Sequence, residues 1–189
     1  MDKFNAWKND NNVSVDPELK EMVYCIGVKH GGQEAWAYVL RNFIDSESTS
    51  EKQFLLDALT CSTQPWLLMT LSEMMFSTDV FSKTEKVSVL ARLPGTPTGR
   101  LLAWNVLEDN WKSIQDEFGE DINLFSVIIS AVTHSINTPA ELNRLRGFLR
   151  QQKNLGRAKA MFETAIDKAE TNIKWKDKYY DTIKAWLSN

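Results

Sequence analysis

Histidine is the first scarcity in this sequence. Its 189 residues include only His30 and His134, and they contain no HExxH and no CxxC motif. A structural zinc site needs four ligands, and a catalytic one needs three together with a water molecule. The sequence therefore predicts that the chain binds no metal ion and no other cofactor by itself.

The motifs of nucleophilic and phosphate-binding enzymes are also absent. No G-x-S-x-G string occurs, and the scarce histidines leave few bases to activate a serine or a cysteine. Residues 94–100, PGTPTGR, carry two glycines but lack the GK[ST] ending of a phosphate-binding loop. We therefore expect that the chain is not an enzyme on its own.

The chain has neither a large charge excess nor a long apolar run. Its net charge is −3 and its isoelectric point is about 5.5, which argues against a nucleic-acid partner. No run of about 18 apolar residues is present, so we expect no transmembrane segment. A hydrophobic content of 43% with 25% charged residues is typical of a globular protein.

What the sequence does contain is helical periodicity. Residues 1–15 are rich in Asn and Asp and predict a flexible N-terminal segment, whereas residues 16–189 predict a single helical domain. Asp16 and Pro17 suit a helix start, and Gly31-Gly32 suits a helix end. The clearest apolar stripe with three- and four-residue spacing consists of Trp104, Leu107, Trp111, Ile114 and Phe118. We expect about nine helices and no strand, with one long helix over about 155–187.

One helix type recurs along the chain. Ala35-Trp36 aligns with Ala103-Trp104, 68 positions later, and the neighbouring apolar positions match as well. Helices that repeat in this way stack into solenoids such as HEAT and armadillo arrays. The sequence therefore predicts an all-α, HEAT/armadillo-like helical solenoid. The concave surface of such a solenoid usually holds a peptide or another protein.

The two cysteines allow two interpretations. Cys25 and Cys61 are 36 positions apart. In a reducing compartment both would be small buried hydrophobic residues, and in an oxidising one they could form a disulfide. The triplet Asn12-Val13-Ser14 is an N-glycosylation sequon, which makes Asn12 a candidate glycosylation site and favours an exported protein.

Basic residues gather between positions 142 and 162, where no acidic residue occurs. They favour a helix C-terminus, because the helix dipole stabilises cations there. The alternative is an anion or peptide patch formed by Arg144, Arg146, Arg150 and Arg157. Solvated helix faces account for most such charge runs, so we prefer the first interpretation.

Four strings together resemble a known family. They are VYCIGVKHGGQEAWAYVLRNF, SEKQFLLDALTCSTQPWLL, GRLLAWNVLEDNW and NIKWKDKYYDTIKAWL. In this order and spacing they resemble the C-terminal domain of aminopeptidase N-type zinc metallopeptidases, from about residue 17 to residue 187. In that family the region is a helical, HEAT-like solenoid.

The resemblance implies a function without catalysis. The C-terminal domain of these enzymes caps the catalytic domain, shapes the peptide-binding chamber and assists folding. The zinc ion and the catalytic residues belong to an upstream domain, and the whole enzyme removes N-terminal residues from peptides. The partners implied are the catalytic domain of the same enzyme and the peptide substrate.

The resemblance also bears on the cysteines. In the aminopeptidase N branch, the cysteines of the VYC and ALxC strings pair, and these match Cys25 and Cys61. The pairing implies an extracellular, cell-surface or secretory-pathway location for the whole protein. Ser62 follows the second cysteine, where relatives with a basic residue could hold a peptide carboxylate, so no peptide-binding residue is carried over.

A stand-alone helical-repeat adaptor with reduced cysteines is the rival hypothesis. Thiol titration of the denatured, unreduced protein separates the two, because a Cys25–Cys61 bond leaves no free thiol. We expect no reactive thiol after oxidative folding. Two free thiols would favour the adaptor.

Overall fold

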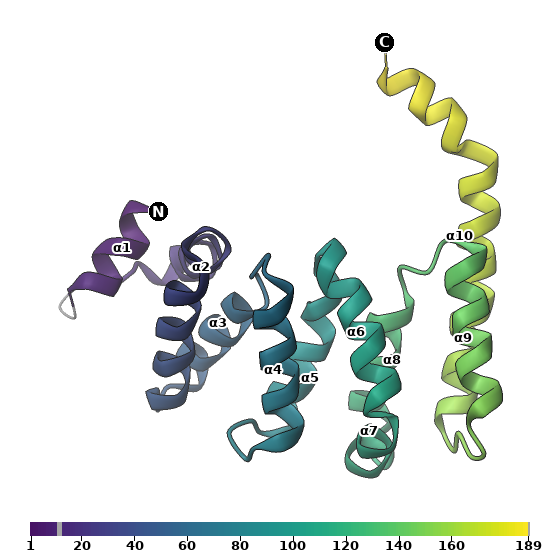
Figure 1. Cartoon of the computed structure of the whole chain (residues 1–189), viewed down its shortest axis with the longest axis horizontal. Helices are drawn as coiled ribbons and strands as arrows, with labels where there is room; N and C mark the ends of the chain where they lie inside the picture. Colours follow the sequence, from purple (N-terminus) through teal and green to yellow (C-terminus); the bar gives the residue numbers. More distant parts are fainter. Residues whose placement is uncertain (11–12, 189) are drawn as a thin grey trace. The chain divides into compact units, whose positions relative to one another are not determined.

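The structure, a computed structural model, describes residues 1–10 and 13–188. Over these residues it contains ten α-helices, two short 3-10 helices and no strand (Figure 1). The predicted all-helical class and the long C-terminal helix are confirmed. The chain forms two compact units, Met1–Asn110 and Trp111–Asn189. The single domain over residues 16–189 stays a prediction. Stacked helices contact mainly their neighbours, so a helical array divides easily into such units.

The first unit alternates its helices between two layers. Helix α2 packs on α3, α3 packs on α5, and α4 packs on α6. Such alternation is typical of helical-repeat proteins. The elements are α1 (Asp2–Asn9), η1 (Pro17–Leu19), α2 (Lys20–Asp45), α3 (Thr49–Leu59), α4 (Pro65–Ser77), α5 (Lys83–Arg92), η2 (Leu93–Gly95) and α6 (Pro97–Asp109).

Helix α1 lies within the N-terminal segment for which the sequence predicted flexibility. The ring of Phe4 is only 1% exposed. It sits where a side chain at Gly27 would be, since a Cβ there would meet the ring at 2.1 Å. Trp7 stacks on Tyr24 with ring centroids 4.4 Å apart. These contacts hold α1 against α2, and no local sequence pattern predicts them.

The glycine pair that was predicted to end a helix interrupts the helical backbone within α2. Gly32 has φ 63° and ψ −153°, which is not helical. A positive φ of this kind favours glycine over any residue with a side chain. The pair therefore marks a kink between two helical segments, and Trp36 and Val39 on the second segment are both buried.

The disulfide implied by the family resemblance joins α2 to the end of α3. Cys25 and Cys61 are bonded, with their Cα atoms 5.4 Å apart. Trp36 supports the same contact by donating a hydrogen bond from Nε1 to the carbonyl oxygen of Leu59 at 3.2 Å. The bond and the hydrogen bond together hold α2 against α3.

The second unit contains α7 (Trp111–Phe118), α8 (Ile122–Thr133), α9 (Pro139–Gln151) and α10 (Ala158–Leu187). Each helix contributes one ring to a shared aromatic cluster, formed by Trp111, Phe125, Phe148 and Phe162. The ring centroids of Trp111 lie 5.5–5.7 Å from those of the other three. The cluster is the centre of this unit's core.

Helices α6 and α7 follow each other where the sequence predicted one continuous helix. Asn110 lies between them with φ −112° and ψ 16°, outside the helical region. Its side chain donates to the carbonyl oxygen of Val106, four residues back, at 3.0 Å. In the aligned copy, Asn42 likewise donates to the carbonyl oxygen of Tyr38 at 2.8 Å. The internal repeat thus extends to a shared hydrogen bond at the end of each helix.

Replacing both cysteines (Cys25→Ser with Cys61→Ser) should lower the free energy of unfolding of the first unit by about 3–4 kcal/mol. The disulfide closes a loop of 36 residues and so restricts the unfolded chain. Hydrogen exchange, followed by mass spectrometry along a urea titration, measures the free energy of unfolding of each unit separately. The transition of residues 111–188 should stay in place and serves as the internal control. Unchanged stability of the first unit in the variant would contradict the prediction.

Candidate functional site

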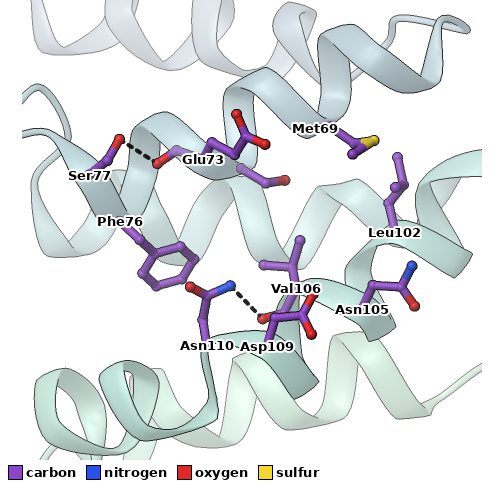
Figure 2. A pocket seen from close by; sticks show the side chains of 10 residues that line it. Met69, Glu73, Phe76, Ser77, Leu102, Asn105, Val106, Asp109 and Asn110 are labelled. Atoms are coloured by element: carbon purple, nitrogen blue, oxygen red, sulfur yellow. Dashed lines mark hydrogen bonds between the residues drawn. The ribbon is translucent and has the colours of Figure 1, made fainter.

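A groove of about 420 Å³ lies between α4 and α6 on the first unit (Figure 2). Figure 2 shows side chains of both helices converging on it, with Phe76 close to Asn110 and Met69 across from Leu102. Phe76 is half-buried, and Met69 is 48% exposed. The groove is therefore an open surface feature that a ligand could reach from solvent.

The groove is lined by both apolar and polar side chains. Met69, Phe76, Leu102 and Val106 supply the apolar surface. The polar side chains are Ser72, Glu73, Ser77, Asn105, Asp109 and Asn110. Ligand sites usually combine mostly apolar walls with a few polar groups that orient the ligand. The carboxylates of Glu73 and Asp109 give this groove a negative charge beside its apolar walls.

Both walls of the groove are held by the core beneath them. Leu68, Leu71 and Met75 on α4 are fully buried and fix which face of that helix points outward. Ser72 donates to the carbonyl oxygen of Leu68 at 2.9 Å, so its buried hydroxyl is satisfied inside the helix. On the other wall, the hydroxyl oxygen of Thr96 caps α6 by accepting from Gly99 N at 2.9 Å.

The groove was not predicted from the sequence, although α4 carries a signal for it. The string PWLLMTLSEMMF has apolar residues on more than one face of the helix, whereas packing against a single core requires only one apolar face. The surplus residues Met69 and Phe76 line the groove. The contribution of α6 had no sequence signal, because it depends on α4 and α6 being neighbours.

The four arginines considered as an anion or peptide patch have different surroundings in the described structure. Arg146 donates from Nη2 to Glu170 Oε1 at 2.5 Å, and Arg157 donates from Nη1 to the carbonyl oxygen of Glu120 at 3.2 Å. Arg144 and Arg150 are exposed on α9. Two of the four arginines thus already have an acidic or carbonyl partner within the chain. A shared peptide or anion site at these arginines stays a prediction.

The remaining positions singled out from the sequence are Asn12 and the two histidines. Asn12 lies outside the described residues. His30 is exposed on α2, and His134 is exposed at the C-terminal end of α8. Among the residues described, no three His, Cys, Asp or Glu side chains cluster so that they could hold a metal ion. The residues present therefore do not fit the zinc ion of the aminopeptidase family. Over the same ranges, no helix is long and apolar enough to cross a membrane.

One buried carboxylate ties α3 to α5. Asp57 is 5% exposed and accepts from Gln53 Nε2 at 2.8 Å, and Arg92 Nε lies 2.5 Å from the same oxygen. Burial raises the pKa of Asp57 above its ordinary value, and Arg92 and Gln53 oppose the shift. The group sits within the core contacts of the first unit rather than in the groove, so its role is structural.

The architecture defines the class of protein. It is a helical-repeat domain in which a disulfide joins α2 to the end of α3, and its first unit carries an open groove. A family model described as the ERAP1-like C-terminal domain matches residues 1–171. The chain belongs to this family of C-terminal domains of M1 aminopeptidases.

Named relatives agree with the family. The chain is similar to the thyrotropin-releasing hormone-degrading ectoenzyme of Rattus norvegicus, with 33% identity over 181 residues, 96% of the chain and 17% of the relative. It is 30% identical to aminopeptidase Ey of Gallus gallus over 187 residues, 97% of the chain and 19% of the relative. It is 28% identical to aminopeptidase N of Homo sapiens over 188 residues, 98% of the chain and 19% of the relative. The chain thus spans less than a fifth of the length of these proteins, and the predicted resemblance is confirmed.

Replacing Asp57 with asparagine should reduce the change of the free energy of unfolding with pH. Burial in the folded state raises the pKa of Asp57 above its ordinary value of 3.8, so the folded state binds a proton more tightly than the unfolded state does. The free energy of unfolding therefore falls as pH rises from 3.8 through the raised value. Urea unfolding across this range should show a shallower slope in Asp57→Asn. The exposed Asp79→Asn is the control, and an unchanged slope in Asp57→Asn would show the argument to be wrong.

Proposed function

We propose that this chain acts as the non-catalytic C-terminal domain of a zinc aminopeptidase that removes N-terminal residues from peptides. The observation that carries the proposal is the family match over residues 1–171. In this role the domain caps the catalytic domain, shapes the chamber that receives the peptide and assists folding. Its partners are the catalytic domain of the same enzyme and the peptide.

The groove between α4 and α6 is the surface that would contact the peptide. Its apolar walls would bind side chains far from the N-terminal residue, and the carboxylates of Glu73 and Asp109 would attract cationic groups. Binding energy from parts of a substrate remote from the reacting bond can be used to position that bond. The domain would in this way contribute to catalysis without a catalytic residue.

Hydrolysis itself is assigned to another part of the enzyme. The described residues bring together no group that could hold the zinc ion. The metal and the residues that act with it therefore belong, in this proposal, to a separate catalytic domain. What this chain supplies is shape and contact area around the substrate.

The location proposed for the whole protein is extracellular, at the cell surface or in the secretory pathway. The Cys25–Cys61 bond supports this, since structural disulfides persist in oxidising compartments and are rare in the cytosol. One relative is by name an ectoenzyme. Glycosylation at Asn12 would follow from the same location.

In an enzyme that carries this domain, Phe76→Ala should raise KM for long peptides about tenfold, because a half-buried ring leaves the groove. The value of kcat/KM for a single-residue anilide should stay unchanged, since that substrate does not reach the groove. Steady-state kinetics on a series of peptides of increasing length measures both effects.

Leu101→Ala is the matched control, because Leu101 is 64% exposed on α6 and does not line the groove. It should behave like the unchanged enzyme on every substrate. Equal losses on anilide and long peptide in Phe76→Ala would contradict a role in peptide contact. A loss in Leu101→Ala as large as that in Phe76→Ala would contradict it as well.

A further inference from the structure

The groove between α4 and α6 has two chemically different ends. Figure 2 shows Met69 of α4 across from Leu102 of α6 at one end, and Phe76 close to Asn110 at the other. The residue numbers rise in the same direction on both walls, so the two helices run the same way along the groove. The groove therefore has a direction, from an end formed by Met69 and Leu102 to an end formed by Phe76.

Negative charge gathers toward the Phe76 end. Glu73 on α4 and Asp109 on α6 are both exposed, one on each wall. Helix α4 ends at Ser77 and α6 ends at Asp109, so both helices bring their C-terminal ends to this end of the groove. The free carbonyl groups of a helix C-terminus carry a partial negative charge, which adds to that of the carboxylates. Of the ten residues that line the groove, none is a lysine, an arginine or a histidine.

The ring of Phe76 adds a second attraction for a cation at the same end. Phe76 is half-buried, and its ring projects between the two helices in Figure 2. The face of an aromatic ring attracts an ammonium or guanidinium group that lies within about 6 Å of its centre. Lysine and arginine also carry an aliphatic stem, which can cover apolar surface while the charged group stays near water. A basic side chain would thus contact the ring with its stem and the carboxylates with its charge.

The length of the groove fixes how far apart two bound side chains can be. Met69 and Phe76 are seven residues apart on α4, which corresponds to about 10 Å along the helix. In an extended peptide, every second side chain points to the same side, and these side chains are about 7 Å apart. The groove therefore has room for two such side chains, an apolar one at the Met69 end and a basic one at the Phe76 end.

We propose that this groove selects peptides in which an apolar side chain and a lysine or arginine lie two positions apart. The inference rests on the proposed contact between the groove and the peptide, and it names the class of peptide that the groove prefers. Glu73 and Asp109 are then the residues that determine this specificity, since they contact the basic side chain and take no part in hydrolysis. An acidic side chain in the same place would be repelled.

Two peptides of equal length test the preference in an enzyme that carries this domain. One contains leucine and lysine two positions apart, and the other has norleucine in place of the lysine, which keeps the stem and lacks the ammonium group. The pair is moved one position at a time along the peptide, beyond the N-terminal residues. At the position that reaches the groove, KM should be about tenfold lower for the lysine peptide. The difference should shrink at high salt, because exposed charges are screened.

Reversing a charge in the groove should reverse the preference. In Asp109→Lys, a peptide with glutamate in place of the lysine should have the lower KM. Asp45→Lys is the matched control, because Asp45 is exposed at the end of α2 and does not line the groove. It makes the same change of charge and should keep the preference for lysine. A switch toward glutamate in Asp45→Lys as large as that in Asp109→Lys would overturn the inference, since the effect would follow net charge alone.

The same kinetics separate this inference from the proposed function. Equal KM for the lysine and norleucine peptides at every position would overturn the inference. If Phe76→Ala still raised KM for the norleucine peptide in that case, the groove would contact the peptide without selecting a cation, and the proposed function would stand. If Phe76→Ala changed KM for neither peptide, the proposed contact would fail together with the preference.

Discussion

The helices of this chain carry apolar faces, and each such face needs a neighbouring helix to cover it. Isolated helices of this length are marginal in water, and most of their stability comes from packing of the apolar face. The buried residues follow this requirement in both units, from Trp36 and Val39 on α2 to Phe162 on α10. The disulfide between Cys25 and Cys61 adds a covalent restraint to the α2–α3 contact.

The same requirement leaves other faces free for function. Helices α4 and α6 are fixed by residues beneath them, such as Leu71 and Leu107, and this frees their outer surfaces to form the groove. A rigid scaffold with a groove on one side can bind a peptide without taking part in its chemistry. At the C-terminal end of α10 the opposite holds, because the neighbouring helices leave its apolar stripe uncovered.

Local patterns predicted the parts of the fold that depend on neighbours in sequence. Asp16 caps the first turn of its helical segment with Pro17 at the first position, as expected, and the long terminal helix is present. Features that depend on distant contacts were missed. Helix α1 is held by the contact of Phe4 with Gly27, and the sequence around neither residue predicts this contact. The groove was missed for the same reason, since it requires two helices that are not consecutive.

The most direct test of the central claim, that this domain contacts the peptide without catalysing its hydrolysis, is photo-crosslinking from position 76. A p-benzoylphenylalanine in place of Phe76, in an active enzyme that carries this domain, should form an adduct with a long peptide. Mass spectrometry should place the crosslink on peptide residues far from the N-terminus, and the same group at Leu101 should give none. An enzyme that cleaves the peptide yet yields no adduct at position 76 would contradict the account.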